Sequence, residues 1–384
     1  MAVNPSIQLG TSGNWAIKED NLLAYKQLGN KFFDREFDFS RGTRATFVGR
    51  NGLIQESGLT STELVTNGDF ATDSNWTKGA GVTISGGKAN WTNTINNVGV
   101  TQSGIMTSGK NYEVVFTVSN YSSGSVRLRF PSITERLTSN GTYTYYINAT
   151  DTNLYIQGET NGDANVNLSI DNVSVKEIQV DVPRIDFTDD TTGHLLLEPQ
   201  SANLIRYSED FSNSYWQKIG SILAPNAITS PDGNLNASKM IADTSLYDHF
   251  LRTTPSFSVN DYSFSIYAKK GEYNFLVLSR IGSTIRTYFD LENGTLGTVA
   301  SGVTASIKDV GNGWFKCEAT YTYSSGTVLD INVAKENGVI EFTGDGTSGI
   351  YIWGAQLEQN SYATSYIPTS GSTVTRNQEI CNNS

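Results

Sequence analysis

The chain has 384 residues, of which 11% are aromatic and 17% charged, and its formal net charge is −11. This length predicts roughly two or three domains, each large enough for a true hydrophobic core. The acidic balance argues against a nucleic-acid-binding protein, because phosphate binding needs a basic face. No apolar run approaches the roughly 20 residues that a membrane helix needs. With only Cys317 and Cys381 present, a disulfide framework is not expected, so packing or oligomerisation has to supply stability.

Residues 1–36 differ from the rest of the chain. Apolar residues at mixed helical spacing, among them Leu22, Leu23 and Leu28, predict a helix within residues 15–33. Asp20 or Asn21 is suited to cap its start. After this segment, runs rich in Thr, Tyr and Val between Gly- and Asn-containing turns predict strands throughout.

Two long segments, residues 62–178 and 202–368, share one plan. Each opens with a short apolar strand, an acidic residue followed by Phe, and a Trp: Asp69, Phe70 and Trp76 in the first, and Asp210, Phe211 and Trp216 in the second. Each continues with alternating apolar and polar residues, which indicates half-buried antiparallel strands. Each closes with an apolar strand, which would bring the two ends of a module together. The internal repeat predicts an all-β protein with two tandem β-sandwiches of jelly-roll or concanavalin-like type.

Two shorter pieces flank the first long segment and look like halves of one element. Residues 37–54 read FDFSRGTRATFVGRNGLI, and residues 181–205 read DVPRIDFTDDTTGHLLLEPQSANLI. Both are strand-like, and the Asn51–Gly52 pair is typical of a hairpin turn.

These pieces also carry a resemblance to a known family. The chain resembles a segment of phage tail, head-fibre and other virion structural proteins, through the blocks FSRGTRATF, NGLI, DVPRIDF, LLLEPQSANLI, YSEDFSNSYW, FSIYAKKG, GNGWFKCEATYT and YIWGAQLEQNSYATSYIPTSGSTVTR. In such relatives NGLI runs almost directly into VPRIDF, so residues 60–179 look like an insertion. The resemblance implies that residues 37–59 and 180–200 together complete a C-terminal sandwich over 180–376, with residues 377–384 as a polar tail.

The inserted segment resembles a carbohydrate-binding module of the jelly-roll kind. The likeness rests on Asn67-Gly68-Asp69-Phe70, on Trp76 and on IDNVSV at residues 170–175. Asn67, Asp69 and Asp171 are candidate ligands for a structural Ca²⁺, since oxygen atoms from the two ends of the module would meet there. The chain departs from many relatives, which have a calcium-binding Glu where Ala71 stands. The alternative is that Asp69 and Asp171 stabilise turns.

Several aromatic residues of the inserted segment are candidates for sugar binding, because aromatic faces stack on sugar rings while polar neighbours orient the hydroxyl groups. These candidates are Trp91, Tyr121, Tyr143 and Tyr145. Alternating Tyr and Thr is also ordinary strand material, so a place in the core or at a strand edge is the preferred interpretation of any single residue. Four other tryptophans are predicted to anchor the cores: Trp76, Trp216, Trp314 and Trp353.

No catalytic residue is predicted. His194 and His249 are the only histidines, and both are expected to be ordinary surface or edge residues rather than catalytic bases. A polysaccharide-degrading tail spike with a carboxylate pair is the enzymatic alternative. None of the 38 acidic residues, however, stands out as such a pair.

The resemblance implies a non-enzymatic structural protein of a phage particle, a fibre, spike or decoration subunit, with weak adhesion to host-surface glycans. Residues 1–36 would attach it to other virion proteins of the capsid, neck or tail. The expected assembly is a homotrimer, because symmetric association buries exposed edge strands. The expected location is the virion surface, after synthesis in the host cytoplasm. Neither nucleic acid nor a membrane is expected as a partner, and no cofactor is expected beyond the structural Ca²⁺.

Overall fold

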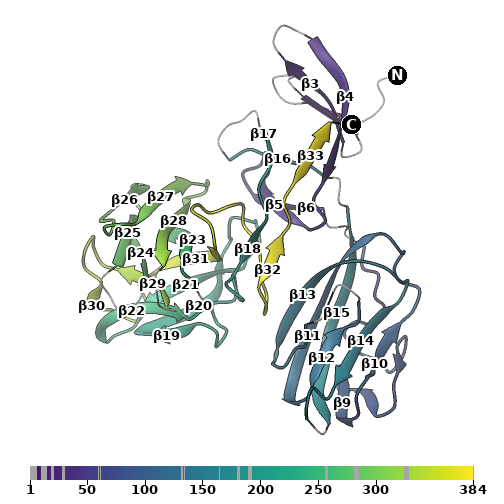
Figure 1. Cartoon of the computed structure of the whole chain (residues 1–384). Coiled ribbons are helices and arrows are strands. Elements are labelled where there is room, and N and C mark those ends of the chain that lie inside the picture. Colours follow the sequence, from purple (N-terminus) through teal and green to yellow (C-terminus); the bar gives the residue numbers. More distant parts are fainter. Residues whose placement is uncertain are drawn as a thin grey trace. The chain divides into compact units, whose positions relative to one another are not determined.

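The computed structural model describes residues 7–9, 15–18, 21–27, 31–58, 60, 62–130, 133, 135–163, 165–179, 182–188, 193–255, 258–280, 285–323 and 328–383. The regular elements within these ranges are β-strands, and no helix in them is long and apolar enough to cross a membrane. The chain divides into two compact units, and most of their strands are labelled in Figure 1. The inserted unit comprises Ser40–Arg44 and Gly58–Val182, and the main unit comprises Met1–Phe39, Ala45–Ser57 and Pro183–Ser384. The inserted unit contains residues 60–179, which the sequence analysis expected to be an insertion.

The N-terminal residues form strands, so the helix expected within residues 15–33 is wrong. A five-stranded sheet has the order β1-β2-β3-β4-β33, and β33 lies beside β4 in Figure 1. Its strands are β1 (Ile7–Leu9), β2 (Trp15–Lys18), β3 (Asn21–Gln27), β4 (Lys31–Ser40) and β33 (Ile380–Asn383). β3 pairs antiparallel with both β2 and β4. Pairing with neighbouring strands therefore overrides the weak helical spacing of this segment.

The inserted unit is an antiparallel β-sandwich of two layers. The five-stranded layer has the order β13-β11-β15-β9-β8, and the four-stranded layer has the order β12-β14-β10-β7. The strands are β7 (Thr77–Lys78), β8 (Val82–Ser85), β9 (Lys88–Thr94), β10 (Val98–Gln102), β11 (Asn111–Ser123), β12 (Ser125–Leu128), β13 (Gly141–Asn148), β14 (Leu154–Glu159) and β15 (Val166–Ile178). Successive side chains of a strand point to opposite faces. In β14, Leu154 and Ile156 are fully buried in the core, whereas Tyr155 and Gln157 are half-buried.

The first and last segments of the inserted unit pair with each other, as predicted. Leu64 N donates to Val175 O at 3.0 Å, and Val173 N donates to Gly68 O at 2.9 Å. Gly68 has to be glycine, because a Cβ there would lie only 2.0 Å from the Val173 carbonyl oxygen. The approach of the two ends therefore explains the glycine at position 68.

The main unit contains a second and larger antiparallel sandwich. One layer has the order β19-β22-β29-β24-β25-β26, with β30 also paired to β22, and the other has the order β20-β21-β31-β23-β28-β27. The strands are β19 (Gln217–Ile219), β20 (Ser221–Ile228), β21 (Ala237–Ala242), β22 (Leu246–Thr253), β23 (Asn260–Lys270), β24 (Phe275–Arg280), β25 (Ile285–Asp290), β26 (Thr295–Leu296), β27 (Thr304–Asp309), β28 (Trp314–Tyr323), β29 (Leu329–Ala334), β30 (Glu341–Thr343) and β31 (Gly349–Glu358). The protein is thus all-β, with two tandem sandwiches, as the internal repeat predicted.

The repeated motif of an acidic residue, a Phe and a Trp, which we call the acidic-Phe-Trp step, has the same geometry in both sandwiches. Trp76 Nε1 donates to Asn67 O at 2.9 Å, and Trp216 Nε1 donates to Tyr207 O at 2.9 Å, in both cases nine residues earlier in the chain. The Phe ring of the step lies 5.1 Å from Trp76 in one sandwich and 5.2 Å from Trp216 in the other. The structure therefore confirms the internal repeat. All four tryptophans predicted to anchor the cores are buried: Trp76, Trp216, Trp314 and Trp353.

The two short pieces that flank the insertion lie side by side. They supply β5 (Ala45–Val48), β6 (Ile54–Ser57), β16 (Arg184–Asp186), β17 (His194–Leu196) and β18 (Ser201–Asn203), and β18 pairs with β32 (Val374–Arg376). Phe187 N donates to Val48 O at 3.0 Å, and Val48 N donates to Asp186 Oδ2 at 2.8 Å. Segments separated by the whole insertion in sequence therefore contact each other in the main unit.

His249 is fully buried in β22, so the surface or edge position expected for it is wrong. Its ring lies 4.5 Å from the Phe342 ring, and Nε2 lies 2.8 Å from Phe342 O. The other ring nitrogen, Nδ1, contacts Gly220 O. His249 thus links three segments of the larger sandwich through its two ring nitrogens.

Candidate functional site

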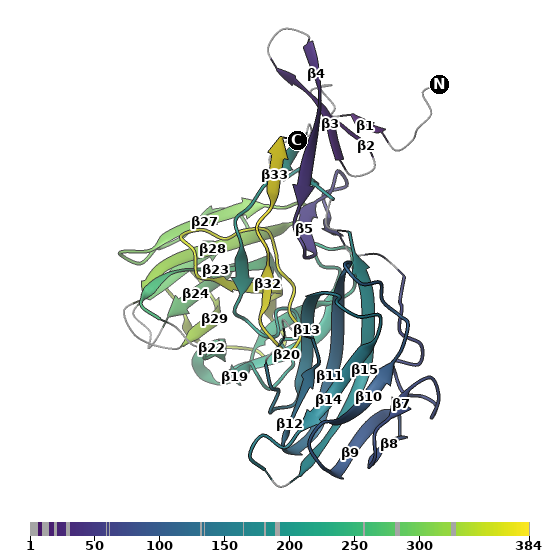
Figure 2. The same ribbon diagram turned by 45° about the vertical axis from the view of Figure 1, so that its right-hand side comes forward.

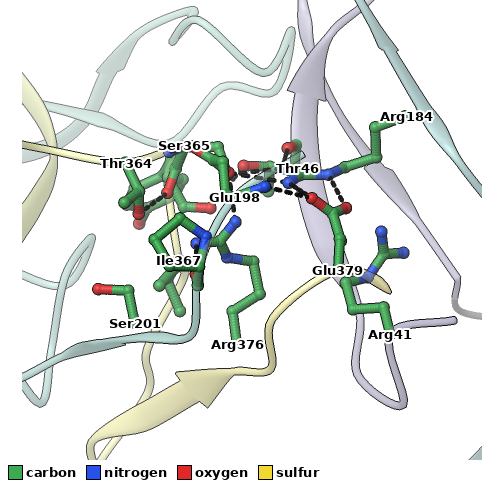
Figure 3. Close-up of polar contacts among 12 residues, drawn as sticks. Arg41, Thr46, Arg184, Glu198, Ser201, Thr364, Ser365, Ile367, Arg376 and Glu379 are labelled. Carbon is green, nitrogen blue, oxygen red and sulfur yellow. Dashed lines mark hydrogen bonds and ion pairs between the residues drawn. The ribbon is translucent and has the colours of Figure 1, made fainter. Parts of the chain in front are cut away.

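Residues from distant segments of the chain converge in one charge cluster of the main unit. Arg184 Nε and Nη2 donate to Glu379 at 2.6 and 2.5 Å, and Nη2 also donates to Glu198 at 2.8 Å. Arg376 Nη1 donates to Glu198 as well. Ser365 donates to Glu198 from both its backbone N and its Oγ, at 2.7 and 2.6 Å. Figure 3 shows these side chains pointing toward one another. We call these five residues the Arg184 cluster.

The Arg184 cluster is arranged for stability rather than for proton transfer. Burial by itself would raise the pKa of Glu198, but the charges of Arg376 and Arg184 and the Ser365 hydrogen bond hold that pKa below its usual value. A carboxylate that stays ionised between two guanidinium groups is a poor general acid at neutral pH. The cluster therefore holds distant chain segments together.

A hollow of about 230 Å³ lies beside this cluster, and Asp186, His194 and Glu198 are among the residues that line it. Asp186 accepts hydrogen bonds from the backbone N of Val48 and of Thr188, at 2.8 and 2.9 Å. Glu198 is held by the two arginines. Both carboxylates are thus engaged by donors of the protein.

Three of the four aromatic residues predicted to bind sugar belong to the core of the inserted unit. Trp91 is 2% exposed, and its Nε1 donates to Val98 O at 2.8 Å. Tyr143 and Tyr145 are each 8% exposed and pack against Phe116. All three therefore lie in the core, the place that the sequence analysis preferred for any single one of them, because the period of two turns them toward the opposite layer.

Tyr121, the fourth predicted residue, lies near the end of β11 and is half-buried. Its hydroxyl donates to Gly124 O at 2.9 Å, which fastens the turn that follows the strand. The structure therefore does not gather the four predicted aromatic residues into one sugar-binding surface.

The predicted calcium ligands make hydrogen bonds within their own loops. Asn67 Nδ2 donates to the carbonyl oxygens of Thr72 and Ser74, at 2.8 and 2.9 Å, and Asn67 Oδ1 accepts from Thr72 N. The amide nitrogen thus holds the two loop carbonyls that a cation would otherwise attract. Asp69 and Asp171 each accept a hydrogen bond from a nearby backbone N, as the turn alternative proposed. Among the described residues, no group of three or more His, Cys, Asp or Glu side chains is placed to hold a metal.

A groove of about 290 Å³ lies on the four-stranded layer of the inserted unit, lined by residues of β7, β10, β14 and the residue that follows β12. Figure 2 labels these strands. The strand register places one row of side chains across the groove: Tyr155 is opposite Thr101, and Thr101 is opposite Thr77. Arg129 extends the row on the other side of Tyr155, since its backbone N donates to Tyr155 O at 3.0 Å and its guanidinium lies 5.5 Å from the Tyr155 ring centre.

A second row beside the first contains Gln157 opposite Gly99. Only glycine fits at position 99, because a Cβ there would lie 2.2 Å from Ile156 O. Gln157 Nε2 donates to Asn97 O at 2.9 Å, so its amide is fixed in place. The groove therefore combines a half-buried aromatic ring, a position without a side chain, and fixed amide and hydroxyl groups, which suits a small polar ligand with an apolar face.

Sequence reasoning did not single out Tyr155, Gln157 or Arg129. The alternation in β14 identifies Tyr155 and Gln157 as residues of one face, opposite to Leu154 and Ile156. That signal shows that the face is polar. It does not show that β10 and β7 lie beside β14 and complete a groove.

No protein-family model matches the chain, and no curated protein matches it either. The solved structures that are similar include the N-terminal tandem CBM22-1–CBM22-2 domain of Xyn10C from Paenibacillus barcinonensis, with 14% identity and a TM-score of 0.27, covering 79% of this chain and 98% of that chain. They also include the plant peptide RALF23 in complex with FER and LLG2, with 12% identity and a TM-score of 0.33, covering 86% of this chain and 100% of that chain. TM-scores this low support no argument about function. The argument about function is based on the groove instead.

Proposed function

We propose that the inserted unit binds glycans in the groove on its four-stranded layer. The observation that carries this proposal is the half-buried Tyr155 ring in a groove that Thr101, Gln157 and Gly99 line as well. A sugar ring presents an apolar face to the aromatic ring, and its hydroxyl groups bond to the amide and hydroxyl groups around it. A shallow groove with one aromatic residue favours weak binding, which many identical copies on one particle convert into avidity.

We further propose that the protein is a non-enzymatic structural subunit on the surface of a phage particle. The resemblance of its main unit to virion structural proteins supports this role. Four residues of these blocks (Arg184, Glu198, Ser365 and Arg376) join Glu379 in the Arg184 cluster, which holds chain segments together. The polysaccharide-degrading alternative needs two carboxylates beside the bound sugar, and none of the residues that line the groove is Asp or Glu.

Two further parts of this proposal concern assembly. Residues 1–36 attach the chain to other virion proteins, and the chain forms a homotrimer, which buries exposed strand edges. Light scattering of the purified protein tests the assembly, with an expected mass of three times the 41.9 kDa of one chain. A mass of one or two chains at all concentrations would contradict the trimer.

A glycan array probed with the full-length protein tests the binding function, with product analysis of every polysaccharide that is bound. Tyr155→Ala is expected to abolish binding. Tyr121→Ala is the matched control, since it removes a half-buried tyrosine from the other layer of the same unit. Loss of binding in Tyr121→Ala but not in Tyr155→Ala would move the site away from the groove. Release of oligosaccharides would show hydrolysis and overturn the non-enzymatic assignment.

A further inference from the structure

We propose that the groove prefers acidic glycans, because Arg129 is placed to bind a sugar carboxylate while Tyr155 contacts a sugar ring. This inference rests on the proposed glycan-binding function and names the class of glycan. It starts from the charges around the groove. The whole chain carries a net charge of −11, yet the charged residues that line the groove are Lys78 and Arg129.

The two cations of the groove differ in what they contact. Lys78 Nζ lies 2.6 Å from both carboxylate oxygens of Asp73, so its charge is compensated within the protein. Arg129 is exposed and stacks over the Tyr155 ring, with 5.5 Å between the guanidinium carbon and the ring centre. Within the described part of the chain, the Arg129 side chain forms no ion pair with a carboxylate. Its charge is therefore available to a ligand.

The neighbouring arginines increase the positive charge on this side of the groove. Arg127 and Arg136 both contact the single carboxylate of Glu159, at 2.8 and 2.5 Å. Two guanidinium groups thus share one carboxylate, which leaves this cluster with a net positive charge. An anionic ligand at Arg129 is attracted by this charge, and the carboxylates of Glu159 and Asp73 are already paired with cations.

The stacking of Arg129 on Tyr155 also fixes the geometry of recognition. A guanidinium group that lies over an aromatic ring keeps its N–H edge free for a planar, bidentate acceptor. A carboxylate has that shape and charge, and bidentate arginine–carboxylate pairs are both stronger and more directional than neutral hydrogen bonds. Uronic acids and sialic acids place a carboxylate directly on a sugar ring. Arg129 and Tyr155 are adjacent in one row of the groove, so one sugar residue can contact both.

Matched pairs of glycans test the inference. Each carboxylate-bearing glycan, such as a polyuronate or a sialylated oligosaccharide, is printed beside its carboxyl-reduced form, and the full-length protein is titrated on both. The wild-type protein is expected to bind the acidic form about three- to tenfold more tightly, as for a partly exposed charged hydrogen bond. This preference is expected to fall with increasing salt concentration, while binding to the reduced form stays constant.

Three variants separate this inference from the proposed function. Arg129→Gln is expected to equalise the two forms without abolishing binding, whereas Tyr155→Ala abolishes binding to both. Lys88→Gln is the matched control, because it removes one positive charge from β9 in the other layer, and it is expected to keep the preference. Equal wild-type binding to both forms, or a preference that survives in Arg129→Gln, would overturn the acidic preference and leave glycan binding intact. Binding to neither form would overturn both.

Discussion

The Arg184 guanidinium and the Glu379 carboxylate form a two-pronged ion pair across 195 residues of sequence, with N–O distances of 2.6 and 2.5 Å. Both side chains have no exposed surface. A buried charge without its partner is strongly unfavourable, so the pair requires both segments to be in place at once. Arg184 lies just after the insertion and Glu379 near the C-terminus. The pair therefore joins the two ends of the long segment that builds the larger sandwich.

Removing Arg184 is expected to destabilise the main unit severely. Arg184→Ala removes the buried guanidinium that pairs with Glu379 and Glu198, and the loss of one partner of a buried ion pair lowers the free energy of unfolding by about 3–5 kcal/mol. Calorimetry measures the effect, with the transition of the inserted unit as an internal reference. Lys270→Ala is the control, because it breaks the half-exposed Lys270–Glu292 pair, for which less than about 1 kcal/mol is expected. Equal losses in the two variants would refute a special role for the buried cluster.

Glu198 is expected to make the stability of the main unit depend on pH. The folded-state pKa of Glu198 is lower than its ordinary value of 4.5, so the folded state favours the ionised form. The resulting stability is present at neutral pH and is lost as the pH falls through the lowered folded-state pKa. Glu198→Gln cannot titrate at this position. The difference in melting temperature between the wild type and Glu198→Gln should therefore shrink as the pH is lowered below 4.5. A difference that is independent of pH would contradict the assignment.

His249 is expected to stabilise the larger sandwich through both ring nitrogens. Nε2 lies 2.8 Å from Phe342 O, and Nδ1 contacts Gly220 O. His249→Phe keeps an aromatic ring but removes the ring N–H, so a buried carbonyl group loses its donor and the free energy of unfolding falls by about 1–3 kcal/mol. His249→Gln keeps a donor and should lose less. Urea denaturation measures both variants, and a His249→Phe protein as stable as the wild type would show that the two contacts contribute nothing.

Substitutions of Trp91 and Tyr155 are expected to affect different properties of the inserted unit, namely its stability for Trp91 and its glycan binding for Tyr155. Trp91→Ala removes a core side chain and should lower the free energy of unfolding of the inserted unit by about 3–5 kcal/mol. Tyr155→Ala truncates a half-buried residue of the outward face and should change it by about 1 kcal/mol or less. Thermal unfolding and glycan titration of the same samples compare the two. Full stability of Trp91→Ala together with lost binding would restore Trp91 as a sugar contact.

We expect that the inserted unit can be deleted from the chain while the main unit still folds. Gln179 N donates to Gly58 O at 2.7 Å, and Thr60 N donates to Glu177 O at 2.9 Å, so the two connecting segments run antiparallel as in a hairpin. Replacing residues 60–177 by Asn-Gly should close this hairpin with a two-residue turn. The shortened protein should keep the calorimetric transition of the main unit and lose glycan binding. An unfolded product would show that the main unit depends on the insertion.

The sequence alone determined the all-β class and the internal repeat. These features depend on local patterns, namely the period of two, the turn residues and the repeated acidic-Phe-Trp step, and such patterns act over a few residues of chain. The geometry of Trp76 and Trp216 repeats for that reason. The helix expected in residues 15–33 was wrong, because its weak apolar spacing yields to pairing with neighbouring strands.

Only the tertiary structure decided which side chains meet. The period of two shows that Tyr143 and Tyr145 share a face, but the packing of the second layer decides that this face is the core. It likewise decides that Tyr155 lies in a groove, since β10 and β7 reach β14 through pairings distant in sequence. The Arg184 cluster is assembled in the same way, from segments up to 195 residues apart. A sequence pattern fixes the face of a strand, whereas burial and contact depend on what packs against that face.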